Sequence, residues 1–89
     1  MTCYIVSFEV AKEETRTKVR EALKTFSGYC PINRTCWAIL SDKKAAEVRD
    51  IVAEGLEAGD RIFVIRSGTA AAWKNSYGEK NTAWLKKNL

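Results

Sequence analysis

Apolar and β-branched residues gather in four short runs, and two longer stretches of helical periodicity lie between them. The strands predicted from these runs cover residues 2–10, 29–32, 35–40 and 61–66. From Lys12 to residue 26 and from Ser41 to about Ala58, apolar side chains recur three and four positions apart, as on one face of a helix. The pattern therefore predicts the order strand, helix, strand, strand, helix, strand.

Turn and capping residues mark the ends of these elements. Gly28 is expected to end the first helix, and Ser41 with Asp42 to cap the start of the second. Asn33 with the following arginine forms a plausible tight turn, which makes residues 29–40 a hairpin. Pro31, the only proline, suits an edge strand because it has no amide hydrogen to donate.

This order predicts an α+β protein with a ferredoxin-like, four-stranded antiparallel sheet and both helices on one face. Residues 79–89 add a short amphipathic helix, which needs a surface to pack on. We expect one domain over residues 1–89, with a core in residues 1–67 and a C-terminal tail in residues 68–89.

The second face of the predicted sheet is left without a helix. Tyr4, Val6 and Phe8 share one face of the first strand and are expected beneath the helices. An apolar face that stays exposed is most simply covered by a second copy of the chain, so we predict a homodimer, with another protein as the alternative partner. The predicted dimer contacts are Ile5, Trp37, Ile39, Ile65 and Trp84.

The composition excludes several kinds of chemistry. The 89 residues contain no histidine, which excludes Ser-His-Asp and Cys-His catalysis and zinc sites that use imidazole. The three cysteines show no CxxC spacing, and their odd number fits a reduced compartment better than a disulfide framework. No signal peptide and no run of membrane-spanning length is visible, so we expect a cytoplasmic protein without a membrane partner.

The net charge of +4 permits nucleic-acid binding without requiring it, because the 15 basic residues are interrupted by 11 acidic ones. Trp73 and Trp84 lie near lysines in the tail, and this basic-aromatic mixture suits nucleic acid. The alternatives are a solvated helix face and tryptophans that pack the tail onto the sheet. The candidate nucleic-acid contacts are Arg16, Arg20, Lys24, Lys74, Lys86 and Lys87.

Four stretches of the chain together resemble a known family. They are Tyr4 to Val10, Thr35 to Ile39, Val48 to Val52 with Leu56, and Gly59 to Ile65, and the ending Trp84 to Leu89 fits them. In pattern and order the chain resembles the small SinR-like proteins of bacteria and their phages, relatives of the smaller CRISPR-adaptation subunit, a CRISPR-associated endoribonuclease family. The VapD toxins share this fold more distantly.

The resemblance implies a ferredoxin-like homodimer formed through the sheets. In the CRISPR members the first strand ends in an aspartate, and the two aspartates of the dimer are assigned to metal-dependent cleavage of RNA or DNA. In the adaptation complex the same dimer holds DNA, and cleavage is not needed.

Glu9 stands at the position of that aspartate and is the candidate catalytic and magnesium-binding residue, with Ser7 on the same face. Its side chain is one methylene longer, and Mg²⁺ tolerates little error in its octahedral geometry. We therefore expect a small dimeric module that binds nucleic acid or protein without efficient catalysis and without a required cofactor. One alternative is a Mg²⁺-dependent endonuclease or endoribonuclease that uses Glu9 from both protomers. Another is a phage or host regulatory protein that binds a protein through its sheet face.

Overall fold

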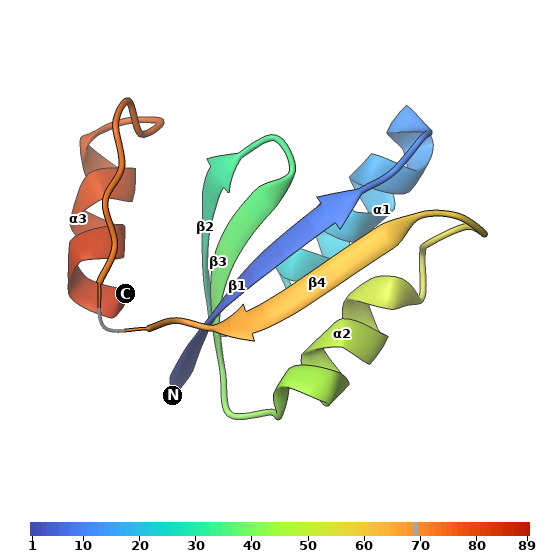
Figure 1. The fold of residues 1–89 in the computed structure, drawn as a ribbon, viewed down its shortest axis with the longest axis horizontal. Helices are drawn as coiled ribbons and strands as arrows, with labels where there is room; N and C mark the ends of the chain where they lie inside the picture. Colours follow the sequence, from blue (N-terminus) through green and yellow to red (C-terminus); the bar gives the residue numbers. More distant parts are fainter. Residues whose placement is uncertain (69) are drawn as a thin grey trace.

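The computed structural model describes residues 1–68 and 70–89. Its elements follow the predicted order, with a helix added at the end (Figure 1). They are β1 (Thr2–Glu9), α1 (Glu13–Leu23), β2 (Gly28–Asn33), β3 (Cys36–Ser41), α2 (Ala45–Ala53), β4 (Arg61–Arg66) and α3 (Glu79–Asn88). In the described part of the chain, no helix combines the length and apolar character that a membrane crossing requires.

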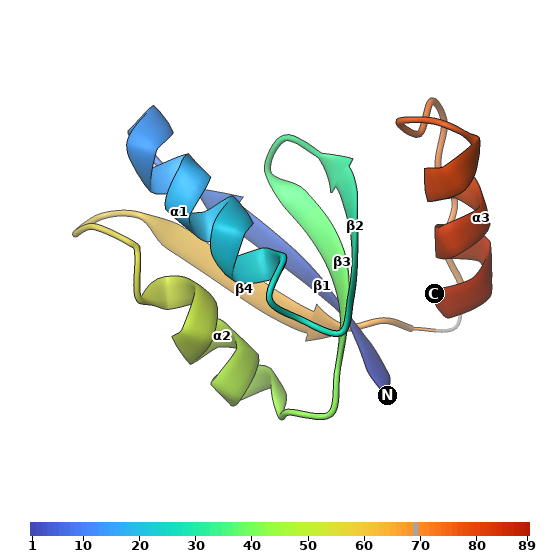
Figure 2. The same cartoon turned by 180° about the vertical axis from the view of Figure 1, so that it is seen from behind.

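The strands form one sheet in the order β2-β3-β1-β4, and every neighbouring pair is antiparallel. This order confirms the predicted ferredoxin-like fold of the α+β class. β2 pairs only with β3, so Pro31 lies on an edge strand as predicted. Figure 2 shows α1 and α2 together in front of the sheet, while α3 stands beside β2, away from both of them.

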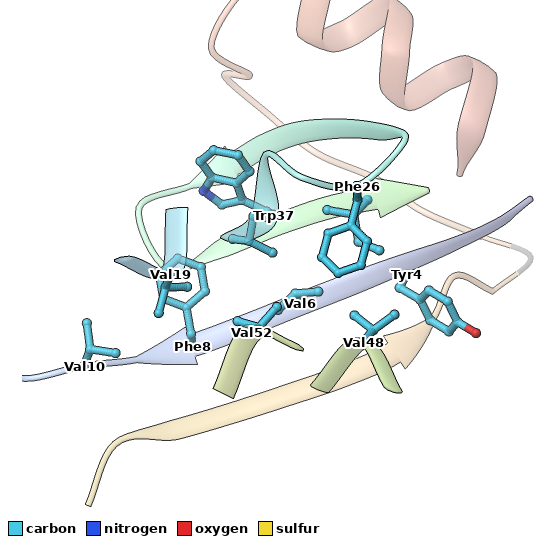
Figure 3. Close-up of a cluster of buried hydrophobic side chains, with 11 residues drawn as sticks. Tyr4, Val6, Phe8, Val10, Val19, Phe26, Trp37, Val48 and Val52 are labelled. Carbon is cyan, nitrogen blue, oxygen red and sulfur yellow. The ribbon is translucent and has the colours of Figure 1, made fainter. Parts of the chain in front are cut away.

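The main core lies between the sheet and the pair α1 and α2. Tyr4, Val6 and Phe8 point from β1 into this layer, which confirms the predicted helix-side face (Figure 3). Val19 from α1 and Val52 from α2 meet them there, and neither exposes any surface. Each side chain of this size contributes about 1.5–3 kcal/mol when fully buried, so this layer is the main source of stability.

Trp37 and Ile39 also belong to the main core, and their predicted placement on the uncovered face is wrong. Val6 stands opposite Trp37 and Tyr4 opposite Ile39 in the β1–β3 ladder. Residues directly opposite each other share a face, so both side chains point toward the helices, where they are only 5% and 0% exposed. They are therefore not available as dimer contacts.

A second, smaller cluster lies on the other face of the sheet, under α3. Leu85 of α3 is 2% exposed and packs against Cys3, Cys30 and Ala38. Asn81 Nδ2 donates a hydrogen bond of 3.1 Å to the carbonyl oxygen of a β2 residue. Trp84 and Leu89 pack beside this cluster, so Trp84, predicted as a dimer contact, packs on its own sheet.

The start of α2 differs from the prediction. This helix begins at Ala45, and Ser41 does not cap it: Ser41 Oγ accepts a hydrogen bond from the Lys43 amide in the preceding turn. The side chain of Glu47 accepts a hydrogen bond from the Lys44 amide at 3.0 Å instead. A carboxylate at this point in the first turn satisfies an otherwise unpaired amide and interacts favourably with the positive end of the helix dipole.

Candidate nucleic-acid interface

Because α3 covers only the β2 and β3 side, the β1 and β4 side of that sheet face stays open. We call this region the open half-face; it consists of the side chains of Ile5, Ser7, Glu9, Arg61, Phe63 and Ile65. Phe63 stands opposite Ser7, and Ile65 opposite Ile5. Phe63 is 62% exposed and Ile65 is 51% exposed, which is unusual for large apolar side chains. The open half-face is therefore a candidate contact surface.

Glu9, the candidate catalytic and metal-binding residue, lies at the end of this surface. Its Oε1 accepts a hydrogen bond of 2.6 Å from Arg61 Nη1. Ser7 is exposed nearby but stands opposite an aromatic ring, not an acidic group. Within residues 1–68 and 70–89, no three acidic or cysteine side chains gather closely enough to hold a metal ion. The arrangement within one protomer thus offers one carboxylate already paired with a cation.

A cavity of about 210 Å³ adjoins the open half-face. Its lining is mostly apolar and includes Ile5, Ile32, Trp73 and Leu85. Trp73 also lines a shallow depression of about 570 Å³, whose wall includes Thr82 and Lys86. Trp73 thus has an apolar hollow on one side and a more polar one, lined by both Glu79 and Lys86, on the other, and it remains 38% exposed.

The positive charge of the chain is concentrated in residues 61–89, which comprise β4, the segment after it and α3. These residues carry six of the 15 basic side chains and only one of the 11 acidic ones, a net charge of +5, whereas residues 1–60 have a net charge of −1. In the part of the chain that the structure describes, Arg61 is the only one of the six in an ion pair. The net charge of the whole chain hides this asymmetry, because the two parts carry opposite signs.

The basic candidates on α1 are arranged differently. Arg16 and Arg20 bind the same carboxylate, that of Glu13, at 2.6 and 2.8 Å. The hydrogen bond from Arg16 lowers the pKa of the Glu13 carboxyl, so this partner stays ionised. Figures 1 and 2 show that α1 and α3 lie apart. α1 packs on the sheet together with α2, whereas α3 lies beside β2. The six predicted contacts therefore do not form one surface, and Lys74, Lys86 and Lys87 belong to the basic region.

The cysteines do not supply a nucleophile. Burial raises the pKa of Cys3 and Cys30, which both lie beneath α3. It also raises the pKa of Cys36, which lies on β3 and on the same face of the sheet. A thiol whose pKa is raised is mostly protonated near neutral pH and is a poor nucleophile. Cys3 and Cys30 serve as small, buried apolar side chains, and Cys36 is half-buried.

Comparison with known proteins supports the fold and gives no information on function. No protein-family profile matches the chain, and no curated protein matches it. Among solved structures, the chain is similar to a hypothetical protein, TT1823, from Thermus thermophilus. The TM-score is 0.67 at 15% sequence identity, and the alignment covers 84% of this chain and 93% of that one. At this identity the likeness supports the ferredoxin-like fold alone.

Proposed function

We propose that the protein is a small nucleic-acid-binding module without catalytic activity, related to the SinR-like proteins that the sequence resembles. The observation that carries this proposal is the net charge of +5 on residues 61–89, beside a sheet face that leaves Phe63 and Ile65 exposed. Basic side chains that form no ion pair among the described residues can replace the counterions of a phosphate backbone.

The position of the basic residues supports this reading. Lys86 lines the same cavities as Trp73, and Lys74 follows Trp73 in the chain. Arg66 lines a further cavity with Gly68 and Leu89, which also border the apolar hollow beside Trp73. Lys86 and Arg66 thus line hollows that adjoin the apolar cavity next to the open half-face, and a ligand with both phosphates and apolar ring faces matches this mixture.

The geometry supports binding better than cleavage. Phosphodiester cleavage with two metal ions requires carboxylates that clamp the ions, and the one candidate, Glu9, is engaged by Arg61. A nuclease built from two copies of Glu9 would first have to break this pair in both protomers. For the proposed function, Glu9 needs no metal, because Arg61 and Glu9 neutralise one another at the rim of the surface.

The test compares two charge-reversed variants in nucleic-acid binding measured by fluorescence anisotropy over a range of salt concentrations. The double variant Lys74→Glu/Lys86→Glu is expected to bind at least tenfold more weakly and to show a flatter salt dependence, because two phosphate contacts are lost. The control Lys18→Glu/Lys43→Glu makes the same change in net charge at two exposed lysines on the side of α1 and α2 and is expected to bind nearly as the wild type. Equal losses in both variants, or no binding by the wild type, would overturn the proposal.

Phe63 and Ile65 also favour a second candidate function, that of a homodimer joined through the open half-face. Two exposed apolar side chains on one strand are the kind of surface that a second copy covers. Sedimentation velocity distinguishes this candidate: the wild type would sediment as a dimer, and Ile65→Glu as a folded monomer. A wild type that stays monomeric at high concentration contradicts it.

A further inference from the structure

We infer that the ligand is single-stranded nucleic acid, whose bases stack on Phe63 and Trp73 while its phosphates meet the lysines beside them. This inference rests on the proposed function and specifies its substrate class. Three observations carry it: an exposed ring on β4, a tryptophan beside an apolar cavity, and a lysine, Lys86, that lines a neighbouring cavity with the same tryptophan.

The first observation is that the ring of Phe63 is not needed by either hydrophobic cluster. Phe63 belongs to neither of them, although its neighbours along β4, Ile62 and Val64, pack against the main core. Its exposed ring has Ser7 directly opposite it, a small side chain that leaves room above the sheet. A flat aromatic face with open space above it is what a base needs for stacking.

The second observation links Trp73 to the same surface. Ile5 stands opposite Ile65 in the β1–β4 ladder and also lines the 210 Å³ cavity with Trp73. The path from Phe63 to Ile65, Ile5 and the cavity therefore runs along one face without crossing a covered region. Residues two positions apart on one strand, such as Phe63 and Ile65, are about 6.6 Å apart, so this path is long enough for more than one base.

The third observation concerns which form of nucleic acid can use these rings. In a duplex the bases stack on one another and their faces are not available, whereas an unpaired strand offers every base to an aromatic side chain. Lys86 lines a cavity with Trp73, so a phosphate next to a base stacked on Trp73 lies within the reach of a cation. A duplex would use the lysines without the rings.

The arrangement differs from the common one for RNA on a four-stranded sheet of this topology, in which aromatic residues on the two central strands stack the bases. Here the central strands β1 and β3 present Ile5, Ser7, Cys36 and Ala38 on that face. The rings lie instead on the edge strand β4 and on the segment before α3. A search for aromatic residues on central strands would miss this site.

The experiment measures binding of a fluorescent oligouridine and an oligothymidine of about 12 nucleotides, and of a duplex of equal length. The variants are Phe63→Ala and Trp73→Ala, with Tyr77→Ala as the matched control, because Tyr77 is 60% exposed but lines none of the cavities around Trp73. Each of the two test variants is expected to weaken single-strand binding at least about fivefold and to leave duplex binding unchanged. In the wild type, tryptophan fluorescence is expected to fall on binding, and Trp73→Phe to remove this change.

The outcomes separate the inference from the proposed function. If the wild type binds both forms and neither ring variant changes single-strand affinity, the inference is wrong while nucleic-acid binding stands. If Phe63→Ala converts a dimer into a monomer without changing affinity, the ring belongs to an interface between copies, and the inference is again wrong. If the wild type binds neither form, both fail. Both side chains are exposed, so we expect each variant to fold. Circular dichroism checks this.

Discussion

Arg61 holds Glu9 across two neighbouring strands, with 2.6 Å between Nη1 and Oε1. The two residues stand directly opposite each other in the β1–β4 ladder, so the backbone itself brings their side chains together. The carboxylate that the family resemblance marks as a metal ligand is therefore engaged by a cation in this chain.

We expect Glu9→Gln and Arg61→Gln to change the free energy of unfolding by less than about 1 kcal/mol, because both side chains of this pair are largely exposed. Urea unfolding measures this change. We also expect wild type and Glu9→Gln to be equally inactive toward RNA and DNA in Mg²⁺. Cleavage by the wild type that disappears in Glu9→Gln would show that the residue is catalytic.

Leu85→Ala is expected to loosen α3 and expose the thiols beneath it. Removing this buried side chain costs about 2–5 kcal/mol in typical cores, and Leu85 is the fully buried anchor of α3. Cys3 and Cys30 should then react with a thiol reagent many times faster than in the wild type. Val52→Ala, on the opposite side of the sheet, is the control: it should lower stability without a comparable gain in reactivity under native conditions. Equal reactivity in both variants would mean that α3 does not protect the thiols.

Asp60→Ala should destabilise the fold by about 1–3 kcal/mol in urea unfolding. Its Oδ1 accepts a hydrogen bond from the Ala11 amide at 3.2 Å, and its Oδ2 one from the Glu57 amide at 2.9 Å. The side chain thus joins the end of β1 to the turn before β4. Asp50→Ala removes a carboxylate that binds only an exposed arginine, and it should change stability by less than about 0.5 kcal/mol. A loss no larger for Asp60→Ala than for Asp50→Ala contradicts the assignment.

Alkaline pH is expected to weaken the fold through the cysteines. Burial raises the pKa of Cys3, Cys30 and Cys36 above their ordinary value of 9.0. As the pH rises, the unfolded chain releases these protons first, so their contribution to stability is complete below pH 9 and is lost as the pH approaches the raised values.

The measurement is urea unfolding at pH 7 and at about pH 10, with a variant in which alanine replaces all three cysteines. The variant differs from the wild type only in its three missing thiols, so it should lose less stability than the wild type over this interval. Identical losses would mean that the thiols do not contribute.

The sequence predicted the element order and the helix-side face of β1, because both depend on local spacing. Tyr4, Val6 and Phe8 alternate with smaller or polar residues, and this alternation alone identifies the buried face. β3 has the same alternation, with large side chains at Trp37 and Ile39 and smaller ones between them. The bulky Trp37 and Ile39 were assigned to the wrong face, although their size compared with Cys36 and Ala38 would have indicated the right one.

The site was predictable only in part, for a physical reason. The amphipathic pattern of residues 79–89 predicted a helix that needs a surface, but the choice between its own sheet and a partner depends on packing distant in sequence. Likewise Glu9 was visible as a carboxylate at a strand end, whereas its pairing with Arg61 depends on the β1–β4 register. The high exposure of Phe63 follows from how little of its sheet face α3 covers.

The unequal distribution of charge has a consequence for how the molecule would approach a polyanion. Residues 1–60, with a net charge of −1, include α1 and α2, and the net charge of +5 lies with β4 and the α3 segment. Long-range forces would turn such a dipolar body before contact, so that encounters begin from a single orientation. The outer surface of α1 and α2 would then face away from the polyanion and stay accessible to a further macromolecule.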